Sequence, residues 1–318
     1  MNHPLSQLSE HKLRATLTEE VHARPYEIMP PPARASFVAM CSGEAGGEVD
    51  WQAVCDLCER FSVEPPAAGA VHFTADLGPF RVCWERHTEF STYGFIQRAP
   101  FDHPFDDPVI DRVPAEWLQQ LPGEALVAIH VAVEDRRAGE RDLSELADLF
   151  SGNTVAGSVV AGGTAKAWTD FRIHDDGFSR VLVEDLDMRV RQAGRMVQRL
   201  VEIETYRMLA LLAFPEARNS GRIISDIGRQ HAALTERISQ LSGLEDEQDA
   251  LNELSRLAAE VERIATATNY RFSAAEAYYA LVERRIEELR EQRVEGVQTF
   301  REFMDRRLSP GAITESGV

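Results

Sequence analysis

The 318-residue sequence lacks any apolar run long enough to cross a membrane. A transmembrane helix needs about 20 consecutive apolar residues, whereas the longest strongly apolar run here is Met208–Phe214. The first residues, MNHPLSQLSEHK, also lack the apolar core of a secretory signal peptide. These absences predict a cytoplasmic protein and leave open a peripheral position at the inner membrane.

Positive charge is in deficit, because 34 Lys and Arg residues stand against 52 Asp and Glu residues, a formal net charge of −18. Nucleic-acid binding depends on basic side chains that neutralise phosphates, so the composition argues against a nucleic-acid partner. It argues equally against docking on anionic lipid by charge alone.

Cysteine is scarce, with only Cys41, Cys55, Cys58 and Cys83 in the chain. Four free thiols fit a reducing compartment. The spacing Cys55-x-x-Cys58 is found in zinc sites, but a structural zinc site usually needs a second ligand pair, which is missing. We therefore interpret this pair as thiols buried along one face of a helix.

The remaining composition, 44% hydrophobic and 27% charged, is that of a globular protein. Most prolines and strand-like segments precede residue 186, and the later pattern is almost wholly helical. We expect an α/β head domain over residues 1–186, a helical or coiled-coil domain over 187–310, and a short tail over 311–318. The predicted fold class is α+β: a largely antiparallel mixed sheet with covering helices, then an antiparallel helical hairpin and a long C-terminal helix.

Several features of the head follow from local patterns. The mostly apolar segment Glu124–Val133 predicts a central strand. Asp50 is placed to cap a helix that ends near Phe61. A hairpin is expected around Gly78-Pro79, with its second strand over Phe80–Ile96. A three-stranded meander is expected with turns at Gly162-Gly163 and at Asp175–Gly177, its strands covering Val155–Val160, Ala165–Ile173 and Phe178–Glu184.

Four helices are expected in the later part of the chain. The first runs from Met188 to Phe214, where Pro215 ends it. The second and third form a hairpin, and the fourth opens with the capping box Ser273-x-x-Glu276 and continues to Leu308. The seam of the hairpin is expected to contain apolar residues spaced by three and four, with His231 as a polar spacer. These apolar residues are Ile224, Ile227, Leu234, Ile238 and Leu241 on the second helix and Leu251, Leu254, Leu257, Val261 and Ile264 on the third.

The stretch CWERHTEF contains the best candidate for chemistry. If residues 83–90 form one strand, Cys83, Glu85, His87 and Glu89 share one face. Their side chains suit a divalent metal such as Zn, Mn or Fe, and a carboxylate beside His87 could tune it as a base. The alternative is the solvated or ion-paired face of a half-buried sheet, which we favour. Arg86 then lies on the packing face and should pair with an acid from the covering helix.

A second candidate is a site for a small anion. His22 and Arg24 lie near the expected end of the first helix, where Arg24 could hold a carboxylate or phosphate. Arg195 and Arg199 share one helix face. Both pairs also have structural interpretations, as a helix C-terminus and as partners in ion pairs with Glu202 and Glu204.

Four blocks of the chain together resemble an uncharacterised bacterial family of predicted membrane-anchored proteins, domain of unknown function 3422. The resemblance implies no catalytic residues. It implies a hydrophobic C-terminal anchor that we expect to be missing here, since the short tail GAITESGV follows Pro310. The blocks are EVHARP (residues 20–25), WERHTEF (84–90), GRMVQRLVEIETYRMLAL (194–211) and the segment from Tyr270 to Pro310.

These observations favour a non-catalytic module that acts in assembly or in coupling to a membrane partner. Self-association or binding of a protein partner through the helical domain is expected. No cofactor is predicted beyond a possible divalent metal. The alternatives are a metal-dependent, hydrolase-like enzyme that uses Glu85, His87 and Glu89, and a regulatory domain that binds a small anion. The substrate, the partner and the oligomeric state do not follow from the sequence.

Overall fold

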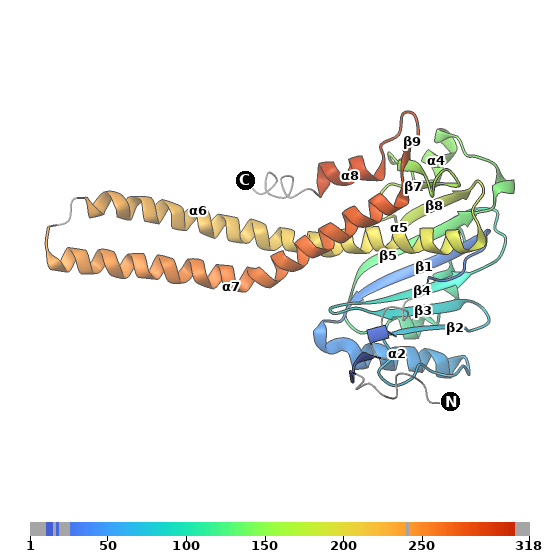
Figure 1. Cartoon of the computed structure of the whole chain (residues 1–318), viewed down its shortest axis with the longest axis horizontal. Helices are drawn as coiled ribbons and strands as arrows, with labels where there is room; N and C mark the ends of the chain where they lie inside the picture. The colour runs from blue at the N-terminus through green and yellow to red at the C-terminus, as the bar shows by residue number, and fades with distance from the viewer. Residues whose placement is uncertain (1–10, 15–16, 19–25, 240–241, 309–318) are drawn as a thin grey trace. The chain divides into compact units, whose positions relative to one another are not determined.

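The computed structural model describes residues 11–14, 17–18, 26–239 and 242–308 (Figure 1). The chain forms two compact units. The head contains the residues up to Val201 together with Leu289–Val297. The helical unit contains Glu202–Glu288 and the residues from Gln298 onward. A short segment near the C-terminus therefore returns to the head.

The head is built on one mixed sheet of nine strands in the order β2-β3-β4-β1-β5-β8-β7-β6-β9. Neighbouring strands are antiparallel except for β5 and β8, which are parallel. The predicted α+β class is therefore confirmed. The strands are β1 (Ala33–Cys41), β2 (His72–Asp76), β3 (Arg81–Arg86), β4 (Ser91–Gln97), β5 (Glu124–Glu134), β6 (Ala156–Val160), β7 (Ala165–Thr169), β8 (Ser179–Asp185) and β9 (Gln292–Arg293).

Strand β5 occupies the middle of the sheet, as its apolar sequence predicts. Both of its faces are buried, with Ile129 and Val131 alternating with His130 and Ala132. A strand covered on both sides has no solvated face and so shows no polar alternation. The meander β6-β7-β8 follows the predicted order, and Gly162 and Gly163 form its first turn with φ of 72° and 93°.

Short helices cover one face of the sheet with two apolar clusters. Helix α2 (Gly47–Arg60) packs Val54 and Leu57 against Trp84 of β3, in a cluster that Trp117 of α3 (Ala115–Leu118) joins. Helix α4 (Leu143–Leu149) contributes Leu146 to a second cluster with β5, β7 and β8. Further short 3-10 segments are η2 (Glu44–Gly46), η3 (Val109–Arg112) and η4 (Arg136–Ala138).

The helical unit differs from the prediction in where its helices end. Helix α5 (Val190–Leu211) breaks at Leu212, and α6 (Ala213–Ile238) starts there with Pro215 in its first turn, where a missing N–H costs little. Helix α7 (Leu244–Leu289) is continuous for 46 residues. The predicted capping box at Ser273 therefore lies inside a helix. It does not form a cap because the helical hydrogen bonds continue through it.

The long C-terminal helix also ends earlier than predicted. Helix α7 stops at Leu289, and Arg290 adopts the left-handed conformation with φ of 53°. Strand β9 follows, and α8 (Phe300–Arg307) begins at a capping box in which Thr299 and Glu302 exchange hydrogen bonds. Apolar residues of this part of the chain are nevertheless buried, including Val282, Leu289, Val297, Phe300 and Met304.

Candidate functional site

The strand face predicted for Cys83–Glu89 is interrupted by a chain reversal. Strand β3 ends at Arg86, and the His87 N–H donates to the Phe90 carbonyl over 2.8 Å before β4 begins. Cys83 and Glu85 therefore share a strand face, whereas His87 and Glu89 belong to the turn. The prediction that residues 83–90 form one strand was wrong, because a turn without glycine or proline interrupts the alternation.

Two of the four residues in this region, Glu85 and His87, form a weak pair. His87 Nε2 lies 3.7 Å from Glu85 Oε1, and the His87 ring stacks on Phe90 at 4.1 Å. Desolvation raises the pKa of the Cys83 thiol to about 12, which disfavours the thiolate that metals bind. Glu89 is buried. Within the described ranges, no group of three or more His, Cys, Asp or Glu side chains is arranged to hold a metal ion.

Arg86 forms the ion pair that its position predicts. Its Nε lies 3.3 Å from Oδ2 of Asp50 on the covering helix α2, and both side chains are buried. Asp50 Oδ2 also accepts from Ser42 Oγ and Ser91 Oγ, over 2.7 and 2.8 Å. Asp50 is thus an internal residue of α2 rather than its N-cap, which is Gly46. The network connects α2 to both strands of the β3–β4 hairpin.

The two cysteines of α2 are free thiols. Cys58 is buried, and burial raises its pKa to about 11. Burial also raises the pKa of Cys55, and Asp56 adds to that shift. Both thiols are therefore protonated near neutral pH and are weak nucleophiles and poor metal ligands.

The arginines proposed to bind an anion are placed in different ways. The Arg195 guanidinium lies over the ring of Tyr26, 5.1 Å from its centroid, and its Nε donates to the Arg191 carbonyl. Arg199 is half-buried on the same helix. His22 and Arg24 lie outside the described residues. The ion pair expected at Glu204 is formed by Arg207 in place of Arg195 or Arg199, with Arg207 Nη2 2.6 Å from Glu204 Oε1.

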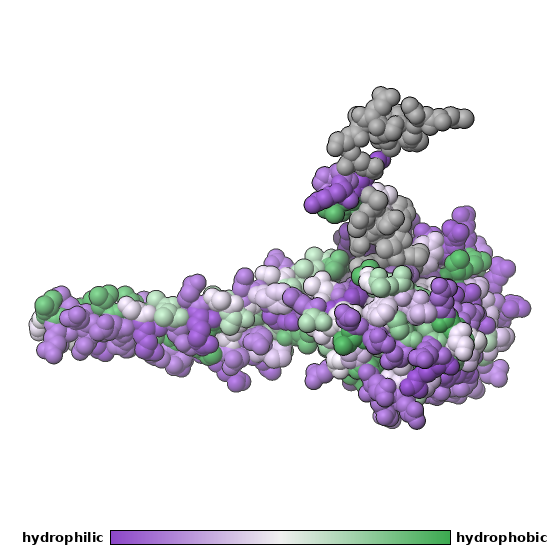
Figure 2. Space-filling model, turned by 90° about the horizontal axis from the view of Figure 1, so that it is seen from below, coloured by the Kyte–Doolittle hydropathy of each residue, from purple (hydrophilic) through white to green (hydrophobic). Residues whose placement is uncertain are grey.

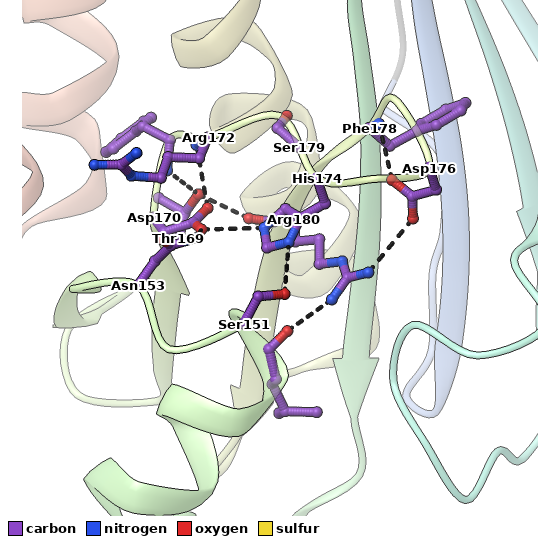
Figure 3. A network of polar contacts seen from close by, with 12 residues as sticks. Ser151, Asn153, Thr169, Asp170, Arg172, His174, Asp176, Phe178, Ser179 and Arg180 are labelled. Carbon is purple, nitrogen blue, oxygen red and sulfur yellow. Dashed lines mark hydrogen bonds and ion pairs between the residues drawn. The ribbon is translucent and has the colours of Figure 1, made fainter.

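A polar cluster that the sequence reasoning missed lies beside α4, in the loop between β7 and β8 (Figure 3). Asp170 is buried and lies 3.0 Å from His174 Nε2, and its Oδ2 accepts from Asn153 Nδ2 over 2.9 Å. Ser151 Oγ lies 3.2 Å from His174 Nδ1. Serine, histidine and aspartate are thus arranged in the order of a catalytic triad.

The backbone around Ser151 does not suit acyl transfer. Ser151 follows the C-terminus of α4, and the N–H groups of Ser151, Gly152 and Asn153 donate to the carbonyls of Asp148, Ala147 and Phe150, respectively. An oxyanion needs free N–H donors, and the negative end of a helix dipole repels it. This cluster therefore supports the loop and the helix end rather than a reaction.

A second missed histidine lies deeper in the head. His130 of β5 lies with Nδ1 2.9 Å from Ser36 Oγ, and its ring stacks on Phe178 at 3.9 Å. The Ile110 N–H donates to the same Ser36 oxygen. His130 Nε2 is 3.9 Å from Asp176 Oδ2, too long for a hydrogen bond. Burial lowers the pKa of His130 to about 4.

Apolar side chains are exposed on the helical hairpin formed by α6 and residues 244–269 of α7, which we call the arm. The seam between the two helices contains Ile227, Leu234, Ala250, Leu257 and Ile264. The predicted seam residues Ile224 and Ile238 are instead exposed by 52% and 46%, and His231 is also exposed. On α7 the exposed residues are Leu244, Leu251, Leu254 and Val261, by 80%, 62%, 38% and 45%.

Helical geometry places these exposed residues on one side of the arm. At about 100° per residue, Ile224 and Ile238 are turned about 40–60° from the seam, in the same rotational sense as Leu254 and Val261 on α7. Antiparallel helices turn in opposite senses when viewed from one end, so the same displacement brings both sets to the same side. We call this side the apolar face; it contains Ile224, Gly228, His231, Ile238, Leu244, Leu251, Leu254, Ala258, Val261 and Ala265.

Polar contacts mark the opposite side of the arm. Arg237 Nη1 lies 3.2 Å from Glu253 Oε2, and Arg256 Nη2 donates to Gln230 Oε1 over 2.6 Å. Figure 2 shows this division, with hydrophobic residues along one edge of the arm and hydrophilic residues along the other. Two helices alone bury only their seam, so among the described residues the large side chains of the apolar face stay exposed.

Comparison with known proteins adds a family but no activity. The sequence model of a family described as Protein of unknown function (DUF3422) matches residues 9–316. No curated protein and no solved structure matches the chain. Among the described helices, none combines the length and apolar character needed to cross a membrane.

Proposed function

The chain belongs to the DUF3422 family, and we propose that it is a non-catalytic assembly module whose arm binds a helical protein through the apolar face. The head would then be a stable platform that carries the arm. Families of unknown function provide no activity to transfer, so the proposal depends on the surfaces and clusters of this chain.

The observation that carries the proposal is the apolar face itself. Six large apolar side chains on one side of the arm are exposed by 38–80%. Full burial of such a side chain contributes about 1.5–3 kcal/mol, so covering the exposed part of each contributes about 1 kcal/mol. A contiguous patch of this kind, edged by polar residues, is typical of protein-binding surfaces. A helical partner fits best because the exposed residues follow helical spacing.

The polar clusters of the described head support a role without catalysis. The His174 and His130 side chains are buried, and Asp50 is engaged with Arg86 and with the hydroxyls of Ser42, Ser91 and Tyr93. Catalytic groups must reach a substrate, whereas these groups join one structural element to another. The Asp50 network resembles the satisfied polar networks that fix a fold.

The proposal is tested by photo-crosslinking in bacteria that express the full chain. A photoreactive phenylalanine analogue replaces Leu254 in one variant and Asn252 in the other. Both positions are exposed on α7, but Asn252 is on the side away from the apolar face. We expect protein adducts at position 254 and none at 252. Equal labelling at the two positions, or no adduct at 254, would contradict the proposal.

A further inference from the structure

We propose that the occupant of the apolar face is a second copy of this chain, which packs antiparallel to form a four-helix bundle. This inference rests on the proposed function and specifies its partner. A two-fold axis perpendicular to the arm, near Ala258, places α6 on the partner's α6 and α7 on the partner's α7. Such an axis makes one patch contact itself, as in most soluble dimers.

The sizes of the side chains favour this antiparallel arrangement. Leucine occurs on the loop half of the apolar face, at positions 244, 251 and 254, whereas Ala265 and Gly221 lie on the other half. With the axis near Ala258, Leu251 lies over the partner's Ala265. On α6, Ile224 lies over the partner's Gly228, and His231 over the partner's Gly221. At these three pairs a large residue meets a small one, the condition for interdigitated packing.

The spacing along α7 points to the same occupant. Leu244, Leu251, Ala258 and Ala265 repeat every seven residues, as do the seam residues Ala250, Leu257 and Ile264. Two adjacent seven-residue repeats on one helix are what a helix needs to contact two neighbours in a bundle. A second copy of the arm has the same seven-residue repeat on its own apolar face, so it can pack against this one without a different partner sequence.

Charge also permits two acidic chains to meet here. Each copy carries a formal net charge of −18, which opposes association in general. The acidic and basic side chains that form contacts across the arm, Glu253, Arg237 and Arg256, are on the opposite side. The surfaces brought together therefore carry few charges, with Glu247 as the acidic residue that the spacing of Leu254 and Val261 places among them.

The available area matches a stable dimer. Helix α6 has 26 residues and is therefore about 39 Å long. Two helices side by side, each about 10 Å wide, present about 800 Å². This is the area per partner in a standard protein interface.

The first test measures the oligomeric state of the purified full chain by sedimentation velocity over a wide concentration range. We expect a dimer for the wild type and for N252K. For L251K we expect the dissociation constant to rise by at least about 100-fold, because the two-fold axis introduces the buried lysine twice. A wild-type monomer at every concentration, or an L251K dimer as tight as that of the wild type, would overturn the inference.

The second test determines the geometry by oxidation of single cysteine variants, with the linked peptides identified by mass spectrometry. A258C should form a disulfide with its own copy, whereas A259C, on the opposite side, should not. A parallel dimer would instead link Cys at 258 to Cys at 228 in the double variant A258C/G228C, and that result would overturn the antiparallel arrangement.

The outcomes separate this inference from the proposed function. Photo-crosslinks at position 254 only to other proteins would refute the second copy and preserve an assembly role. A monomer that floats with phosphatidylcholine vesicles, and loses that property in L251K, would assign the face to lipid and refute both. Adducts of the chain with itself at position 254 would support both.

Discussion

Acid should destabilise the head through His130, a buried residue that the structure holds in its neutral form. The imidazole is 3% exposed, stacks on Phe178 and faces Asp176 and Arg180. Burial, with help from the Arg180 charge, lowers its pKa from 6.5 to about 4, although Asp176 acts in the opposite direction. The unfolded chain therefore binds a proton at His130 that the folded chain does not bind between these two pH values.

The sign and size of the effect follow from proton linkage. Because the unfolded state binds the extra proton, stability is complete above the unfolded pKa and falls as the pH drops from about 6.5 towards 4. Each unit between the two pKa values corresponds to about 1.4 kcal/mol. The free energy of unfolding should therefore decrease by about 3 kcal/mol through His130 alone. Burial raises the pKa of Glu184, which changes stability in the opposite direction.

The measurement compares the wild type with H130N in urea unfolding at a series of pH values. The amide oxygen that this substitution introduces can still accept from Ser36, but the amide does not titrate. Tryptophan fluorescence reports on the head alone, because its residues 51, 84, 117 and 168 all lie there. The Glu184 contribution is common to both proteins and cancels in the difference. Parallel curves for the two proteins, or an NMR titration of His130 near pH 6.5, would refute the reasoning.

Two further predictions concern the β3–β4 hairpin. D50A should lower the free energy of unfolding of the head by about 3–5 kcal/mol, because Arg86 would remain buried without its carboxylate. The double variant D50A/R86M should recover part of this loss. Urea unfolding that shows D50A within about 1 kcal/mol of wild type would contradict the assignment. E85A and H87A should each change stability by less than about 1 kcal/mol, as for a weak partly exposed pair. Elemental analysis should find no stoichiometric metal in the wild type; zinc, manganese or iron that both substitutions remove would restore the metal-site alternative.

The sequence predicts the head well wherever burial sets the pattern. Strand β5 has no polar alternation because both of its faces are covered, and its place in the centre follows from this alone. The pairing of Arg86 with an acid of the covering helix also follows, because a buried guanidinium requires a carboxylate. In both cases burial, of a strand or of a charged side chain, leaves few structural arrangements that satisfy it.

The errors occur where tertiary contacts outweigh local signals. The box at Ser273 has the sequence of a helix start, yet α7 passes through it. Arg290 ends α7 in a left-handed conformation that glycine usually adopts, so the sequence contains no stop signal there. Thr88 and Glu89 reverse the chain without a residue typical of turns. Propensity cannot predict such positions when packing determines the backbone.

The missed polar clusters have a different cause. Asp170 and His174 lie in a loop, and Asn153 and Ser151 follow a helix some 20 residues earlier in the sequence. No spacing rule connects these segments, because the sheet register brings them together. The signal available in the sequence was the group of polar residues between Thr169 and Phe178, which includes Gly177. Such a group indicates a structured loop, but it does not show which residues elsewhere in the chain the loop contacts. The seam of the arm was shifted for a related reason: α6 and α7 each have two apolar sides, and only their pairing shows which side is internal.

The return of residues 289–297 to the head has a consequence for synthesis on the ribosome. Strand β9 pairs with β6, and Val297 joins the core beneath α4, yet both are translated after the whole arm. A nascent chain that has reached residue 201 still exposes the outer edge of β6 while another 90 or so residues emerge. Premature stop codons before Leu289 should therefore yield products with an open sheet edge, prone to aggregation and to proteolysis.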